Sequence, residues 1–143
     1  MDSQGKPARQ LLEDAWVFKP AATGTGWTGS WEALPPAPKS VSASASPAPV
    51  LPGGHIIFWG GVDKEIIRHT DPATHPGLGS RLVYFDAVKN TWVDKGIVRQ
   101  YKARVTLPSV QWKNEWLYIG GEVRPGIRTN AITSIKAAYD PKQ

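Results

Sequence analysis

The sequence predicts an all-β fold that forms part of a β-propeller, and two repeated patterns carry this prediction. An apolar run that ends in a glycine doublet occurs twice, and the doublets Gly60-Gly61 and Gly120-Gly121 are 60 residues apart. Trp31 and Trp92 repeat at a similar spacing of 61 residues, and a short apolar segment precedes each of them. Gly 14 and Pro 13 among 143 residues indicate many turns. A repeat of this length with frequent turns is typical of propeller blades.

A glycine doublet, a following strand and then a tryptophan are typical of kelch blades, whose four antiparallel strands run from an inner strand A to an outer strand D. The predicted fold class is therefore an all-β, partial kelch-type β-propeller with a little over two four-stranded blades. We expect polar tails at residues 1–10 and 139–143 and a propeller over 11–138, with blade pieces at about 11–34, 41–94 and 103–136.

The first blade piece is expected to supply only the two outer strands. Strand C covers about Leu12–Phe18, and strand D lies around Trp31. Between them, the small residues of Ala21–Gly29 predict an inserted loop, which makes Trp27 a rival for the repeat position.

A complete blade and three strands of a third blade follow. The expected strands are A near Ser42–Val50, B at His55–Trp59, C at Arg81–Phe85 and D at Thr91–Asp94, then A at Arg104–Val110, B at Trp116–Ile119 and C at Asn130–Ile135. Pro47 and Pro49 weaken the first A strand because proline donates no ladder hydrogen bond, but Pro108 recurs at a comparable place and indicates a tolerated bend.

The loops from D to A and from B to C are expected on one face, because successive antiparallel strands reverse direction. The B-to-C loop of the complete blade, with an insertion over Val62–Ser80, is much longer than the one after Gly121. Long loops on one face of a scaffold are where binding residues concentrate.

About two blades do not close a ring, and an open propeller exposes its edge strands. We therefore expect this chain to be part of a larger propeller. It is either a fragment whose other blades are missing or one of several copies that assemble into a ring.

The composition excludes several function classes. The net charge is +5, but the basic residues are scattered, so no nucleic-acid partner is expected. The absence of cysteine excludes disulfides, thiolate metal sites and thiol nucleophiles. Asp71 and the three histidines show no metal-ligand spacing, and neither a metal nor another cofactor is expected. No apolar run approaches the length of a membrane span, and the polar start at Met1–Gln10 predicts no signal peptide, so the compartment stays open.

Glu122 and Arg128 are the candidate chemical pair. Both lie in the short B-to-C loop, where Pro125-Gly126 predicts a turn that brings the two side chains together. Residues alone leave a solvated surface ion pair as the simpler interpretation. The glycine doublets, by contrast, are interpreted as structural, and Trp31 and Trp92 as packing residues between blades.

The motif Gly-Gly-Glu-x-x-Pro-Gly-x-Arg-Thr at Gly120–Thr129 resembles that of the N-acetylneuraminate epimerases, also called sialic acid mutarotases, and of their cyclically permuted kelch relatives. The resemblance covers most of Leu11–Ile135. It includes Leu12-x-Asp14-x-Trp16, Ser46-Pro47-Ala48-Pro49-Val50, His75-Pro76-Gly77 and Ala103-Arg104-Val105-Thr106. It implies an isomerase that is active in a complete six-bladed propeller, with a sugar-acid substrate and a periplasmic or secreted location.

The resemblance also implies roles for the pair: Glu122 as proton acceptor and Arg128 as its catalytic companion. Arginine stays charged, so Arg128 suits the holding of a carboxylate or oxyanion. Arg104 is a candidate second anchor for an anionic group, with a packing or ion-pair role as the alternative. His75 is a candidate substrate-binding residue and His69 a weaker one, although histidines in a surface loop often have no role.

A second function class stays open. A non-catalytic kelch module that binds proteins or carbohydrates would show the same strand pattern. Kelch copper radical oxidases share only the architecture, because their Cys–Tyr cofactor needs a cysteine that this sequence lacks.

Overall fold

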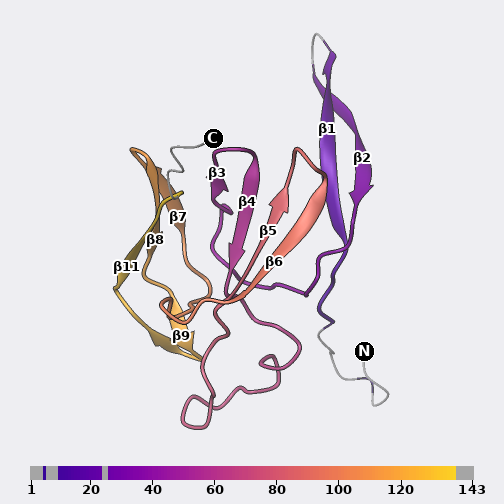
Figure 1. Cartoon of the computed structure of the whole chain (residues 1–143). Coiled ribbons are helices and arrows are strands. Elements are labelled where there is room, and N and C mark those ends of the chain that lie inside the picture. Colours follow the sequence, from indigo (N-terminus) through magenta and orange to yellow (C-terminus); the bar gives the residue numbers. More distant parts are fainter. Residues whose placement is uncertain (1–4, 6–9, 24–25, 138–143) are drawn as a thin grey trace.

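The chain forms part of an open β-propeller (Figure 1). The computed structural model describes residues 5, 10–23 and 26–137. Within these residues, the regular secondary structure consists of β-strands alone. The middle sheet is a complete antiparallel blade in the order β3 (Val50–Leu51), β4 (His55–Trp59), β5 (Arg81–Asp86) and β6 (Thr91–Ile97). The predicted tails lie almost entirely outside the described residues.

The other sheets are incomplete blades or hairpins. A three-stranded sheet has the order β11-β8-β7, and hairpins pair β1 with β2 and β9 with β10. The strands are β1 (Ala15–Thr23), β2 (Gly26–Leu34), β7 (Ser109–Trp112), β8 (Glu115–Ile119), β9 (Glu122–Arg124), β10 (Ile127–Arg128) and β11 (Ile132–Ile135). These sheets do not close into a ring. The prediction of an all-β partial propeller is confirmed.

The middle blade is stabilised by buried side chains on its two central strands and by a capped turn. Val83 and Phe85 of β5 are buried, as is Ile57 on the neighbouring β4. The buried Asp86 carboxylate accepts hydrogen bonds from the backbone N–H groups of Val88 and Lys89, and these bonds, with the nearby Lys89 charge, lower the pKa of Asp86. The cap fixes the β5–β6 turn.

The inner strands are shorter than the sequence predicted. The A strand expected over Ser42–Val50 is regular only at β3, and the one expected over Arg104–Val110 begins only at Ser109. The missing parts form single bridges, such as Ser46 with Pro108. Two causes are visible: prolines lack the ladder donor, and Ala43 and Thr106 have positive φ angles of 57° and 50°, which interrupt an extended strand.

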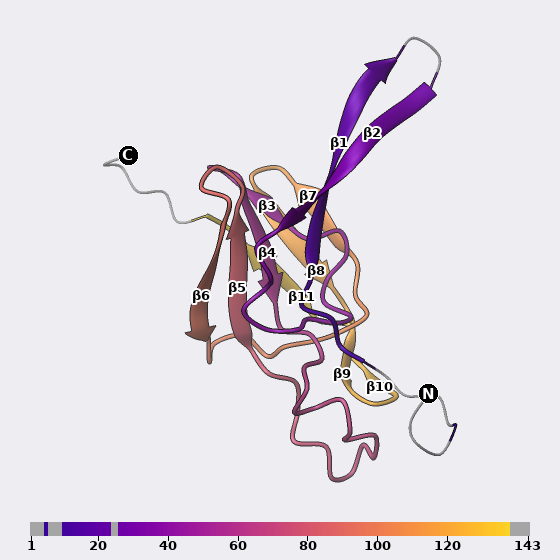
Figure 2. The same cartoon turned by 90° about the vertical axis from the view of Figure 1, so that its right-hand side faces the viewer.

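The loop predicted at Ala21–Gly29 was wrong. Strands β1 and β2 stay paired from Ala15↔Leu34 to Thr23↔Gly26, so this segment belongs to one long hairpin. It projects from the rest of the chain (Figure 2). Next to this segment, the rings of Phe18 and Trp31 are in contact across the two strands at 5.2 Å, and such cross-strand pairs stabilise a hairpin.

The two repeat tryptophans differ in packing. Trp31 is 65% exposed, so its predicted role between blades was wrong for the described part of the chain. Trp92 is half-buried, with Phe58 and Phe85 at ring distances of 5.5 and 5.2 Å. Its indole N–H donates to the Pro35 carbonyl at 2.7 Å. Trp92 therefore connects the middle blade to the segment that follows β2.

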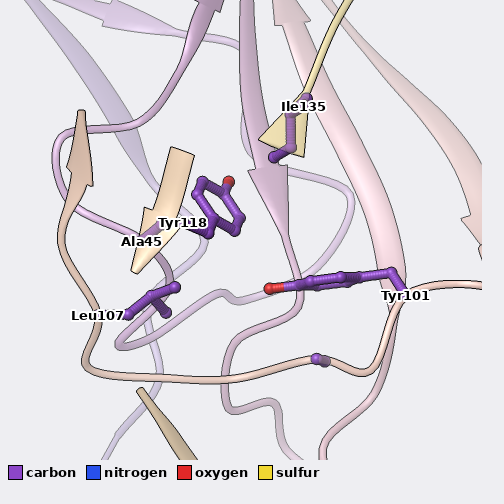
Figure 3. Close-up of a cluster of buried hydrophobic side chains, with 6 residues drawn as sticks. Ala45, Tyr101, Leu107, Tyr118 and Ile135 are labelled. Carbon is purple, nitrogen blue, oxygen red and sulfur yellow. The ribbon is translucent and has the colours of Figure 1, made fainter. Parts of the chain in front are cut away.

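The hydrophobic core lies where the middle blade meets the three-stranded sheet (Figure 3). Its buried members come from several chain segments: Ala45, Tyr101, Ala103, Leu107, Tyr118 and Ile135. Trp59, Leu78 and Trp116 pack against them. Because Leu78 belongs to the β4–β5 insertion, this core also fixes the base of that long loop.

The loops that carry the candidate site share one end of the molecule. The β4–β5 insertion and the β9–β10 hairpin extend from the same end of their sheets in both views (Figures 1 and 2). This arrangement is the one expected for two B-to-C loops.

Replacing Trp92 with alanine should lower the free energy of unfolding by about 3 kcal/mol, at the low end for large aromatic truncations because the side chain is only half-buried. Trp92→Phe keeps the ring contacts and loses the hydrogen bond to Pro35, so its cost should be about 1 kcal/mol. Urea denaturation followed by circular dichroism measures both. Equal costs for the two variants would contradict the assigned packing role.

The chain by itself should self-associate, because β1 and β11 each pair on one side only among the described residues and exposed sheet edges recruit further strands. Ile132, 64% exposed on β11, offers a control: Ile132→Lys places a charge on this edge and should reduce association. Light scattering after gel filtration tests this expectation. A monodisperse monomer with a cooperative unfolding transition would contradict it.

Candidate functional site

Glu122 stands at a position that the blade repeat defines. In the middle blade, Ser42 and Val62 exchange two backbone hydrogen bonds directly after Gly60-Gly61. In the next blade, Val105 and Glu122 exchange the same pair after Gly120-Gly121, at 3.0 and 2.9 Å. Glu122 is therefore the equivalent of Val62. Because the middle blade forms this bridge with valine, the fold does not need a carboxylate here.

The glycine doublets make this bridge possible. Gly61 and Gly121 have φ angles of 99° and 111°, which side chains rarely adopt. A Cβ on Gly121 would lie 3.1 Å from the Cβ of Arg104 and 3.2 Å from the Val105 carbonyl oxygen. The second glycine of each doublet thus lets the inner strand approach closely, which agrees with the structural interpretation of the doublets.

The turn at Pro125-Gly126 brings Glu122 and Arg128 together, as predicted. The intervening segment is a β-hairpin, not an irregular loop, and Arg128 pairs with Glu122 across it. The Arg128 guanidinium lies 4.0 Å from the Glu122 carboxylate, with side-chain exposures of 57% and 28%. The sequence did not indicate these two short strands, which are three and two residues long.

Arg128 is oriented by the inner strand. It donates a hydrogen bond to the Thr106 carbonyl oxygen at 3.0 Å and lies 3.5 Å from the Thr106 hydroxyl. Thr106 has a positive φ of 50°, unusual for a β-branched residue, and its N–H donates to the Ala43 carbonyl. Ala43, its equivalent in the middle blade, has the same conformation, so this strain belongs to the blade and not to the site.

A small cleft opens beside Glu122. Its volume is about 180 Å³, and it lies between the β4–β5 insertion and the β9–β10 hairpin. The residues lining it are Val62, Ile66, Ile67, His69, Thr70, His75, Leu78, Val105, Glu122, Arg124 and Pro125. The walls thus combine apolar side chains with the Glu122 carboxylate, the Arg124 guanidinium, the Thr70 hydroxyl and two histidines. Arg128 is outside this lining.

His75 is buried in the wall of the cleft. Only 4% of it is exposed, so the expectation of a surface histidine was wrong for this residue. Its Nδ1 accepts a hydrogen bond from the Gly77 N–H at 3.0 Å, and its ring meets that of the exposed His69 edge-on at 6.3 Å. The sequence His75-Pro76-Gly77 signalled a turn but not the burial of the imidazole.

Arg104 faces a different cavity. It is 2% exposed, and its guanidinium donates to the carbonyls of Gly120 and Ala131 and to the Thr133 hydroxyl. It lines a hollow of about 510 Å³ together with Trp59, Tyr101 and other residues, and Glu122 is not among them. Of the two roles that the sequence left open, this geometry favours the structural one.

A third hollow, of about 390 Å³, was not anticipated. It contains Lys39, whose pKa is lowered mainly by burial, with the charges of Asp63 and Asp94 opposing that shift. Arg81, which forms an ion pair with Asp94, also lines it. Its residues come from segments far apart in sequence, so no local motif could reveal it.

Two further findings concern the residues that the structure describes. They contain no group of three or more acidic or histidine side chains suited to a metal ion. They also contain no helix long and apolar enough to cross a membrane.

Comparisons with known proteins support the architecture. No family model and no curated protein sequence matches the chain. Among solved structures, the chain is similar to that of YjhT, with a TM-score of 0.57 and 23% sequence identity. The fold is that of a partial β-propeller. The match covers 85% of this chain but only 35% of YjhT, so the chain spans about a third of that structure.

Replacing Arg104 with methionine should lower the free energy of unfolding by about 2–4 kcal/mol, because it removes three part-buried hydrogen bonds from a charged donor. The exposed Arg99 is the matched control, and Arg99→Met should change stability by less than about 0.5 kcal/mol. Thermal and urea unfolding measure both. If Arg104→Met were as stable as the control, the hydrogen bonds of Arg104 to Gly120, Ala131 and Thr133 would contribute nothing to stability.

Proposed function

We propose that this chain is part of a sialic acid mutarotase-like isomerase, which interconverts the α and β anomers of N-acetylneuraminate when the propeller is complete. One observation carries the proposal: a carboxylate, Glu122, replaces the valine of the equivalent blade position and faces a cleft, with Arg128 beside it. The resemblance of the Gly120–Thr129 motif to the N-acetylneuraminate epimerases gives the substrate class. A periplasmic or secreted location belongs to the same proposal.

Glu122 is the proposed general base. Mutarotation removes the proton of the anomeric hydroxyl, breaks the bond between the anomeric carbon and the ring oxygen, and yields the open keto form. The ring oxygen gains a proton, and closure on the other face of the carbonyl gives the other anomer. A carboxylate within hydrogen-bond reach of the hydroxyl suits the first step. The half-buried Glu122, at the edge between cleft and solvent, is open to a substrate hydroxyl.

Arg128 is the proposed anchor for the substrate carboxylate. Its planar group of five N–H donors matches a carboxylate in a two-pronged geometry. Thr106 holds the guanidinium in place, while 57% of the side chain stays exposed to a ligand. Base and anchor then lie on one short hairpin, which fixes their separation.

The size of the cleft limits what it holds. At about 180 Å³ it is smaller than ligand pockets in general, which span roughly 300–1,000 Å³. It therefore suits the reacting end of a sugar acid, and the remainder would extend past Arg128 into the space that further blades enclose. A binding module without catalysis is the competing function.

In the complete propeller, Glu122→Gln should reduce catalysed anomer exchange about 10² to 10⁴-fold, the usual contribution of a general base, while leaving the fold intact. NMR exchange spectroscopy of N-acetylneuraminate measures this rate. Glu65, an exposed carboxylate of the β4–β5 insertion that does not line the cleft, gives the control: Glu65→Gln should catalyse anomer exchange at the rate of the unchanged protein. Full activity of Glu122→Gln would favour the binding module.

Arg128→Lys should raise KM for the sugar acid at least about tenfold, because a point charge loses the two-pronged contact with a carboxylate. Arg99→Lys, at an exposed arginine away from the cleft, is the control. An unchanged KM in Arg128→Lys would show that Arg128 is not part of the site. The role of Glu122 would then depend on the Glu122→Gln result alone.

A further inference from the structure

We propose that His75 is the hydrogen-bond donor of this cleft, acting through Nε2–H on the ring oxygen of the sugar while Glu122 accepts the anomeric hydroxyl. The inference deepens the proposed function and rests on it for the identity of the sugar. It assigns His75 a role in stabilising charge, beyond contact with substrate.

The tautomer of His75 follows from its backbone contact. Nδ1 accepts a hydrogen bond from the Gly77 N–H, and an accepting ring nitrogen needs its lone pair. The ring proton is therefore on Nε2. The hydrogen bond that one ring nitrogen makes sets the state of the other, so the turn at Gly77 orients the donor.

The remaining nitrogen has no partner within the described part of the chain. The hydrogen bond of the His75 ring involves Nδ1, and no hydrogen bond there involves Nε2. Nε2 is also not completely enclosed by protein atoms, unlike the unpartnered hydroxyl of Tyr101. With 96% of His75 covered, the cleft is the surface through which such an atom is reached. A buried donor without a protein acceptor costs free energy unless water or a ligand satisfies it.

The cleft combines the half-buried Glu122 carboxylate as acceptor with the buried His75 imidazole as donor, beside apolar residues such as Ile66. Three further polar residues line it, but all are exposed, so His75 is its buried donor: His69, Thr70 and Arg124. The anomeric centre of a cyclic sugar acid shows the complementary pair on one carbon, with a hydroxyl that donates and a ring oxygen that accepts. Few other groups of a sugar present a donor and a pure acceptor so close together.

The proton and electron balance of the step is simple. Glu122 takes the anomeric hydroxyl proton, the carbonyl forms, and the electron pair of the broken C–O bond stays on the ring oxygen. The Nε2–H hydrogen bond stabilises this developing charge, and a water molecule then supplies the proton that the ring oxygen keeps. The hydroxide so formed recovers the proton from Glu122. A preformed donor aimed at developing charge is typical of catalytic sites, and a neutral imidazole suits the task.

Two substitutions separate the nitrogens. In His75→Asn, the side-chain oxygen can replace Nδ1 as acceptor for Gly77, but the Nε2 donor is lost. In His75→Gln, the side-chain amide N–H reaches the place of Nε2, but the contact with Gly77 is lost. We expect kcat to fall about 10²-fold in His75→Asn with little change in KM, and less than about tenfold in His75→Gln.

Long-range ¹H–¹⁵N NMR of the labelled imidazole in the 143-residue chain gives a readout besides activity. We expect a protonated Nε2 and an unprotonated Nδ1 in wild-type protein, with a shift of the Nε2 signal on addition of N-acetylneuraminate. A protonated Nδ1, or an Nε2 signal that ignores the sugar, would overturn the inference.

The two proposals fail in different ways. If His75→Asn keeps full activity in the complete propeller while Glu122→Gln is inactive, the donor role of His75 is refuted and the mutarotase proposal stands. Equal losses in His75→Asn and His75→Gln would also refute the donor role, because they would mark His75 as structural. If the complete propeller shows no catalysed exchange but the Nε2 signal still responds to N-acetylneuraminate, the mutarotase proposal fails and the donor remains as part of a binding site.

Discussion

The geometry of the candidate site depends on the guanidinium of Arg104. It donates to the carbonyls of Gly120 and Ala131, which flank the segment that carries Glu122 and Arg128. The Gly120 N–H also donates to the Ala131 carbonyl. A buried charge is costly unless several acceptors satisfy it, and here three acceptors do so. Arg104 therefore closes the base of the hairpin, while its own side chain faces another cavity. Arg104, a candidate anchor for an anionic group in the sequence, instead fixes the ends of the segment that carries Glu122.

The blade repeat explains why Glu122 is informative. Residues that recur in both blades, such as the glycine doublets and the positive-φ pair Ala43 and Thr106, are explained by the close approach of inner strands. The two blades differ most clearly at one equivalent position, where one blade has the carboxylate of Glu122 and the other has Val62. A half-buried carboxylate contributes little to a bridge made by backbone atoms. The proposed site gives this carboxylate a role that the fold does not.

Local patterns in the sequence gave the outer architecture correctly. Strand β4 has the predicted bounds, and β5, β6 and β8 begin within one residue of them, because period-two alternation and glycine doublets are local signals. The inner strands could not be placed, since Ala43 and Thr106 have positive φ angles and are joined by a backbone hydrogen bond between distant segments, which no local pattern indicates. The pairing of Glu122 with Arg128 followed from the Pro-Gly turn. The burial of His75 and the hydrogen bonds of Arg104 could not be predicted from local patterns, because both depend on residues from other segments.

The proposed pair of hydrogen-bond donor and general base is shared between two blades. His75 belongs to the insertion of the middle blade and Glu122 to the hairpin of the next, so their relative position is set by the packing of these blades against each other. That packing is the core of Tyr101, Leu107, Tyr118 and Ile135, with Leu78 joining it to the insertion. Close-packed interiors transmit small displacements, and a shift of about 1 Å between catalytic groups is enough to slow a reaction considerably. The proposed chemistry thus depends on the core beneath the cleft, and substitutions of Tyr118 or Ile135, which do not line the cleft, would displace the residues that do.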